Sequence, residues 1–219
     1  MAERTGPEPP RLEPVELPEL REPRDTGDVR EGERYEDLDW SGADREFWTF
    51  TGCAFRRTNL DGTALRGSHL NEVVLDGLEV AELVAPRSTW RRVELTSSRI
   101  GSAEIFDTSW RSVRVSGAKI GYLNARAAEW QDVRFADCTI GELDLSSARV
   151  TRLAFAGCRI ETLTLSSARL VDVDLRGADF RAITGPAGLA GSWITEDQLT
   201  ELAPHLARHL KISIGGDAV

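Results

Sequence analysis

Apolar residues recur at every fifth position of this chain from Phe50 to Phe180, and no polar residue interrupts the series. A period of five fits neither the 3.6-residue period of a helix nor the two-residue period of a strand. A backbone that turns a corner every five residues is the simplest way to keep these side chains on one inward side. The pattern therefore predicts a solenoid.

A longer period is superimposed on the first. Trp90, Trp110 and Trp130 fall twenty residues apart, and an isoleucine series runs from Ile100 to Ile160 at the same spacing. Twenty residues, as four sides of five, would make one coil. Ordering such a coil costs roughly 20 to 40 kcal/mol, while burying its four central side chains contributes only about 6 to 12 kcal/mol. Each coil must therefore stack on its neighbours.

Two features of the repeat concern packing. Inward tryptophans next to small residues such as Ala85 and Ala125 indicate volume compensation rather than an aromatic ligand platform. A glycine column, Gly101, Gly121 and Gly141, suggests a corner that needs either an unusual backbone angle or a close approach of two coils.

Short units such as AGCRI, SSARL and RGADF, the segment LNEVVL and the run TNLDGTALRGSHL resemble the pentapeptide-repeat family, whose units follow a pattern close to A(D/N)LXX. The resemblance covers about residues 46–183. It implies an all-β fold, a right-handed quadrilateral parallel β-helix. Val and Leu replace the family's Ala at many positions, and Asp or Asn is scarce before the centres, so we expect less regular faces in the same register.

The predicted organisation has three parts. Residues 1–34, rich in Pro, Glu and Arg, form an extended acidic tail, which is either a solvating extension or a partner-binding arm using Val15, Leu17 and Leu20. Residues 35–183 form the β-helix. We expect its first coil between Tyr35 and Phe50, because Arg45 breaks the register there and a terminal coil must be capped. Residues 184–219 form a loop and a short helical cap.

In this last part, Thr195 is the predicted N-cap, with Glu196 and Asp197 in the first turn. Pro204 should split or kink the helix. The apolar face either covers the last coil or forms a homodimer contact, which carboxyl-terminal elements provide in some members of the resembled family. The candidate residues for both uses are Leu199, Leu202, Leu206 and Leu210.

The formal net charge of −9 is unevenly distributed. Residues 1–45 hold 14 acidic and 7 basic side chains, whereas residues 46–183 hold 18 of each. No apolar run approaches the eighteen residues of a membrane span, and the amino terminus lacks a signal-peptide core. We therefore expect a cytoplasmic protein without a membrane partner. Cys138 and Cys158 lie one coil apart, within disulfide reach, but read better as small core residues.

No catalytic, cofactor or metal site is predicted. His205 and His209 have an i,i+4 spacing but lack further ligands, and no nucleophile and base can be paired. One surface group is a candidate for interaction, although an ordinary solvated surface would look the same. It consists of Arg91, Arg92, Arg111, Arg114, Arg134, Arg149, Arg152 and Arg169. Acidic residues fall toward another side: Glu104, Asp107, Glu142 and Asp144.

These observations favour a non-enzymatic, rigid scaffold for protein–protein interaction, with an unknown protein partner and no direct contact with nucleic acid. The resemblance implies an alternative, because some members of the family imitate DNA and protect type II topoisomerases (DNA gyrase) from gyrase poisons. The balanced charge of residues 46–183 speaks against this, since imitation of DNA needs phosphate-like charge along the faces.

Overall fold

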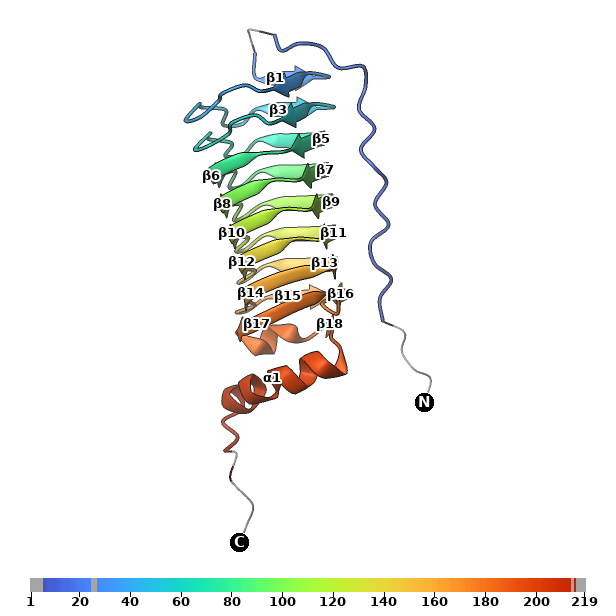
Figure 1. The fold of residues 1–219 in the computed structure, drawn as a ribbon, viewed down its shortest axis with the longest axis vertical. Helices are drawn as coiled ribbons and strands as arrows, with labels where there is room; N and C mark the ends of the chain where they lie inside the picture. The colour runs from blue at the N-terminus through green and yellow to red at the C-terminus, as the bar shows by residue number, and fades with distance from the viewer. Residues whose placement is uncertain (1–5, 25–26, 214, 216–219) are drawn as a thin grey trace.

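A computed structural model describes residues 6–24, 27–213 and 215. The chain forms a straight rod of about eight coils, with the strands of successive coils stacked in parallel (Figure 1). The register predicts a solenoid and the resemblance implies a quadrilateral parallel β-helix; the structure has this fold, followed by one helix. Parts of the segments 1–34 and 184–219 lie outside the described residues.

Two parallel sheets form the walls of the rod. The first contains β1 (Val29–Glu31), β2 (Arg34–Glu36), β3 (Thr49–Thr51), β4 (Ala54–Arg56), β5 (His69–Asp76), β7 (Thr89–Thr96), β9 (Ser109–Ser116), β11 (Glu129–Ala136), β13 (Arg149–Ala156), β15 (Arg169–Val171), β16 (Val173–Asp174) and β18 (Ser192–Trp193). The second contains β6 (Glu79–Val84), β8 (Arg99–Glu104), β10 (Lys119–Asn124), β12 (Thr139–Asp144), β14 (Cys158–Thr164) and β17 (Ala178–Thr184). The remaining elements are a 3-10 helix, η1 (Pro186–Leu189), and the helix α1 (Glu196–His209).

The twenty-residue coil is confirmed by the pairing of strands. Trp90 pairs with Trp110 and Trp110 with Trp130. Ile100 pairs with Ile120 in the same way on the second sheet. Each side chain therefore lies directly over its equivalent in the coil before.

The inward columns form one continuous core. Trp110 stacks between Trp90 and Trp130, with ring centroids 4.8 and 4.6 Å apart. The Trp90 indole N–H donates to Ser88 Oγ at 2.9 Å, whereas the Nε1 atoms of Trp110 and Trp130 have no hydrogen-bond partner among the described residues. The tryptophans thus fill the core. Cys53, Cys138 and Cys158 are free and buried.

The glycines at 101, 121 and 141 are required by the close approach of the backbone one coil earlier. Three of the four corners turn through left-handed backbone, for example at Arg87, Arg92 and Ser97. The fourth does not, because Gly101 and its equivalents lie within extended strands. A Cβ atom on Gly101 would lie 2.5 Å from the carbonyl oxygen of the residue one coil earlier. The unusual angle was therefore the wrong alternative.

The ladder begins at Val29, earlier than the expected start between Tyr35 and Phe50, because β1 pairs with β3. An arginine, Arg30, occupies its inward position and hid this coil from the apolar pattern. Arg30 is 5% exposed and forms an ion pair with the buried Glu33 at 3.7 Å, and its guanidinium lies over the Trp48 ring. Tyr35 donates to Glu33 at 2.6 Å, and burial raises the Tyr35 pKa. These groups cap the rod.

The helix α1 covers the other end. Its N-cap is Thr195, as predicted, and a capping box joins Thr195 to Gln198. The Gln198 side-chain amide also donates to the carbonyls of Leu175 and Ala178 in the last coil, at 2.9 and 2.7 Å. Of the two expectations for Pro204, the split is wrong, because one continuous helix passes through it, and the kink stays a prediction. Proline removes one main-chain hydrogen bond of the helix. The contacts of α1 with the last coil stabilise the helix enough for it to continue past this position.

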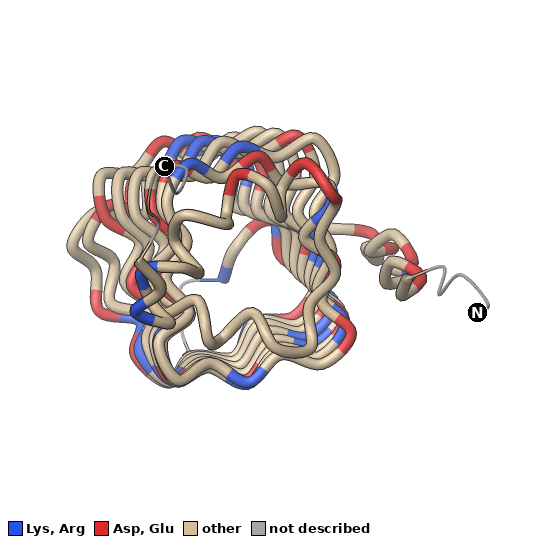
Figure 2. Tube along the Cα trace, turned by 90° about the horizontal axis from the view of Figure 1, so that it is seen from below, with Lys and Arg blue, Asp and Glu red and all other residues tan. Residues whose placement is uncertain are grey.

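The segment 6–24 runs along the outside of the rod, from the last coil back to the first (Figure 1). Seen along the axis, it stands beside one face (Figure 2). Its position brings the acidic tail of the sequence onto a long side of the solenoid.

Candidate interaction surface

The eight candidate arginines all lie on the first sheet. They occupy adjacent strands, so that equivalent positions form like-charged neighbours: Arg91 pairs with Arg111, Arg114 with Arg134, and Arg149 with Arg169. The structure therefore brings the group together on two adjoining faces.

Four of these arginines bind a carboxylate that lies one coil earlier. The nitrogen–oxygen distances are 2.8 Å for Arg92 and Glu72, 3.3 Å for Arg114 and Glu94, 2.8 Å for Arg149 and Glu129, and 2.5 Å for Arg152 and Asp132. The hydrogen bond from Arg152 lowers the Asp132 pKa below its ordinary value. These cations are neutralised in place.

The other four have no acidic partner in the part of the chain that the structure describes: Arg91, Arg111, Arg134 and Arg169. Arg91, Arg111 and Arg169 are exposed, and Arg134 is half-buried. Since stacking places Arg91 directly beside Arg111, the two guanidinium groups repel each other and would both gain from a shared anionic partner. They are the strongest candidates within the group.

Of the two rod residues that bond to the tail, Arg114 belongs to the predicted group, whereas Glu94 was missed by the sequence reasoning. Glu94 accepts the Val15 backbone N–H at 3.2 Å, and Arg114 donates to the Leu12 carbonyl oxygen at 2.7 Å. The available signal was weak. Apolar residues recur at every second or third position from Pro10 to Leu20, but such spacing does not identify the surface that they cover.

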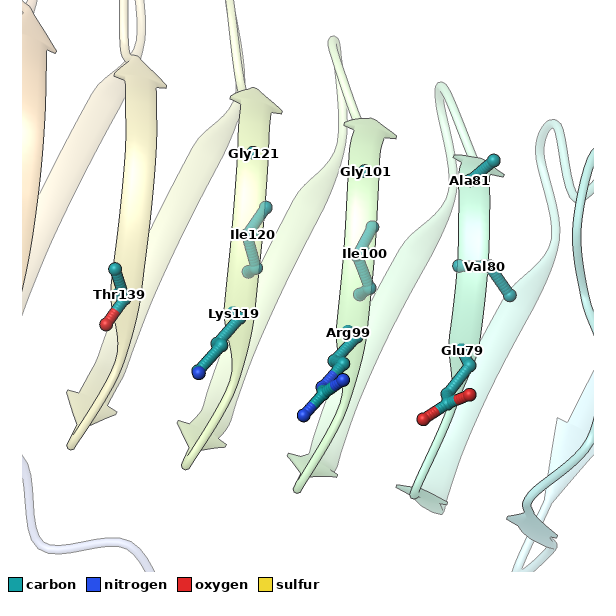
Figure 3. Close-up of a pocket in the computed structure, with 10 residues that line it drawn as sticks. All are labelled: Glu79, Val80, Ala81, Arg99, Ile100, Gly101, Lys119, Ile120, Gly121 and Thr139. Carbon is teal, nitrogen blue, oxygen red and sulfur yellow. The ribbon is translucent and has the colours of Figure 1, made fainter.

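A shallow groove of about 570 Å³ lies on the second sheet (Figure 3). Its floor contains Gly101 and Gly121, and the side chains of Glu79, Arg99 and Lys119 project along one edge. Neither cation forms an ion pair among the described residues. The groove exists because the glycine column has no side chains to fill it.

Charges of both signs lie on the outside of the rod (Figure 2). Acidic and basic residues are interspersed around its outline (Figure 2). Glu104 and Asp144, on the acidic side, are separated in their column by Asn124, which donates to Glu104 at 2.5 Å. Glu142 lines the same sheet, and Asp107 lies 3.7 Å from Arg87. The solenoid wall therefore shows no unbroken acidic column in these positions.

The candidate residues of α1 divide between two environments. Leu202 is buried and Leu206 is partly buried against the core, so both cover the last coil. Leu199 and Leu210 are 50% and 65% exposed, and Ile212 beyond the helix is 57% exposed. One apolar face thus caps the rod along one edge and remains open along the other.

The described residues contain no group of three or more His, Cys, Asp or Glu side chains placed to hold a metal ion. No described helix has the length and hydropathy needed to cross a membrane.

Comparison with known proteins identifies the repeats. Residues 49–79 match the family model of pentapeptide repeats, in eight copies. No curated protein matches the sequence. Among solved structures, the chain is similar to trypsin-treated QnrB1, a plasmid-mediated fluoroquinolone resistance protein, with 16% identity, coverage of 84% of this chain and 97% of that chain, and a TM-score of 0.34.

It is also similar to HetL, a pentapeptide repeat protein involved in heterocyst differentiation regulation from the cyanobacterium Nostoc sp. strain PCC 7120. Here the identity is 18%, the coverage 75% of this chain and 88% of that chain, and the TM-score 0.30. Because both scores lie below 0.5, the assignment rests on the chain's own repeats. Residues 49–79 match the family model, and the same register builds the quadrilateral coils as far as Phe180: the chain carries pentapeptide repeats.

Proposed function

We propose that this protein is a non-enzymatic, cytoplasmic scaffold that binds a protein partner through the arginine-bearing faces of its first sheet. The observation that carries the proposal is the exposed Arg91 and Arg111 pair, neither of which forms an ion pair among the described residues, whereas four of the other six arginines of the group do. A rigid rod holds the two cations at a fixed spacing, which suits recognition of carboxylates or phosphates on a folded partner.

A pull-down from the host organism with matched variants tests this proposal. Arg91→Glu with Arg111→Glu should remove the captured partner, because it reverses the proposed contact. Arg99→Glu with Lys119→Glu makes the same change of net charge in neighbouring coils of the second sheet, and should leave capture intact. Equal loss with both variants, or capture unaffected by either, would refute the assignment of this surface.

Protection of a type II topoisomerase by imitation of DNA remains the second candidate function, and one observation favours it. Glu13, Glu16, Glu19 and Glu22 are exposed on the segment that runs along the rod. At three residues per turn of an extended, proline-rich segment, they would follow one another about every 9 Å. A supercoiling assay with DNA gyrase and a quinolone tests this, with the four glutamates changed to glutamine as the control. Absence of any effect of the wild-type protein on gyrase would eliminate the candidate.

We also propose that a second copy of the chain can bind the open edge of α1 formed by Leu199, Leu210 and Ile212. Leu199 and Leu210 are only 50% and 65% exposed, so their burial favours such a contact by about 1 to 2 kcal/mol each. Light scattering should show a dimer that Leu199→Asp with Leu210→Asp converts to a monomer. Val171→Asp, at a similarly exposed position on β15, should leave the mass unchanged. A wild-type monomer at high concentration would contradict this contact.

A further inference from the structure

The segment 6–24 is bound to the rod in an extended form across most of its length. Near one end, Gly6 lies against the guanidinium of Arg176 in the last coil. In the middle, Leu12 and Val15 bond to Arg114 and Glu94. The segment therefore contacts coils that are far apart along the axis, and occupies one face almost from end to end.

The segment is amphipathic toward the rod. Pro10 is buried, and its apolar successors at positions 12, 15, 17 and 20 are half-buried, while all residues between them are exposed. The exposed side carries the glutamates. This alternation is that of a peptide fitted to a surface rather than of a solvating tail.

The two halves of the segment are held differently. Residues 18–24 continue the main-chain hydrogen bonding of the first coil: the Arg21 N–H donates to the Gly32 carbonyl, and the Arg34 N–H to the Arg21 carbonyl, both at 2.9 Å. In the described structure, residues 6–17 form only the two hydrogen bonds of Leu12 and Val15 with the rod. The first half is therefore a detachable strap, and the second half its anchor.

The two side chains that hold the strap, Glu94 and Arg114, form hydrogen bonds with its main chain. Glu94 and Arg114 are themselves paired at 3.3 Å and are 19% and 29% exposed. One accepts a backbone N–H and the other donates to a backbone carbonyl, an arrangement that any extended peptide can satisfy. The apolar positions on either side then select the sequence.

We propose that the face around Glu94 and Arg114 is a binding site for an extended, proline-containing peptide of a partner protein, and that residues 6–17 are its built-in competitor. A partner peptide would resemble the strap in sequence, with apolar residues two or three positions apart. It would bind in an extended form without joining the sheet as a strand. A tethered segment acts at an effective concentration near millimolar. The partner's apparent affinity equals its affinity for the open face multiplied by the fraction of time that the strap leaves the face open.

The inference rests on and deepens the scaffold function proposed above by assigning a peptide ligand to the face that bears Arg114, which adjoins the face of Arg91 and Arg111, but the binding that it predicts can be measured without any partner. Its test also avoids Arg91 and Arg111. Failure of one proposal can therefore be told apart from failure of the other.

The test uses the full chain and a fluorescein-labelled peptide with the sequence of residues 6–20, GPEPPRLEPVELPEL. Leu12→Glu with Val15→Glu, changed only in the strap of the protein, should release the strap and leave the face intact. Anisotropy should then show the peptide binding at least about tenfold more tightly to this strap variant than to the wild-type protein, since a strap docked for nine-tenths of the time masks the face by that factor.

Two controls define the site. Adding Glu94→Ala and Arg114→Ala to the strap variant should abolish peptide binding, and a labelled peptide carrying the same two glutamate substitutions should not bind the strap variant. Both rod substitutions are on outward-facing side chains, and circular dichroism checks that the fold persists. Equal affinity for the wild type and the strap variant, or no binding to either, would overturn the proposal.

Hydrogen exchange provides a measurement that needs no peptide. In the otherwise wild-type protein, Arg114→Ala should accelerate exchange of the Val15 amide relative to the Arg21 amide, which belongs to the anchor. Unchanged exchange of Val15 would show that the strap is not held there. A wild-type dimer that the strap variant converts to a monomer would assign the face to the arm of a second copy and overturn the proposed partner.

Discussion

Trp110 is the side chain on which the stacking of the coils can be tested most directly. It is 3% exposed, and both faces of its ring are covered, by Trp90 and by Trp130. Trp110→Ala removes the middle of this stack and leaves a cavity that the rigid ladders on either side cannot close. Trp110→Phe is the matched change that keeps an aromatic ring in the column.

The expected loss can be worked out from these contacts. Removing a buried tryptophan side chain typically lowers the free energy of unfolding by about 3 to 5 kcal/mol. Two stacked contacts, at about 0.5 to 1.5 kcal/mol each, place Trp110 in the upper part of this range. The unpartnered indole N–H is lost as well, which offsets about 1 to 3 kcal/mol. We therefore expect a net loss of about 2 to 4 kcal/mol for alanine, and a smaller loss, under about 2 kcal/mol, for phenylalanine.

Equilibrium unfolding in urea, followed by far-UV circular dichroism, measures both variants. Tryptophan fluorescence of the same samples checks that the rod unfolds as one unit, because repeat proteins can unfold in segments. A loss below about 1 kcal/mol for Trp110→Ala would show that the coils do not depend on the stack. Equal losses for alanine and phenylalanine would show that a ring kept at this position contributes neither stacking nor packing.

Three further predictions concern the groove, the cap and pH. Gly121→Val should lower the midpoint of thermal unfolding, because its Cβ would clash with the Gly101 carbonyl oxygen; an unchanged midpoint would contradict this clash. Gln198→Ala should cost about 2 to 4 kcal/mol in urea unfolding, since it leaves two carbonyls of the last coil and one cap unpaired; a smaller change than for an exposed alanine substitution would refute it. Arg152 lowers the Asp132 pKa, so the stability from this pair is present above about pH 4 and lost as the pH falls below it; Asp132→Asn should flatten the thermal stability of the protein between pH 5 and 2, and an unchanged profile would contradict the pairing.

The candidate surface was only partly predictable. The sequence places the eight arginines on one side, because their register positions repeat with the coil. It does not show that Arg152 is neutralised while Arg111 is unpaired. That difference depends on whether an acidic residue stands in the same column one coil earlier, and on the direction in which each side chain bends.

The sequence by itself determined the coil. Its period, its tryptophan column and the Thr195 cap are local or repeated features. Stacking places equivalent residues of successive coils over one another, so the same conformational preference acts in every coil. Only the tertiary structure decided where the ladder begins, which side of α1 stays open and where the acidic tail lies. Arg30 completes a coil although it breaks the apolar pattern. Its charge is paired with Glu33, and its guanidinium group stacks on the Trp48 ring. The strap is fixed by contacts between residues 79 and 102 positions apart, Val15 with Glu94 and Leu12 with Arg114, and no repeat in the chain encodes so distant a meeting.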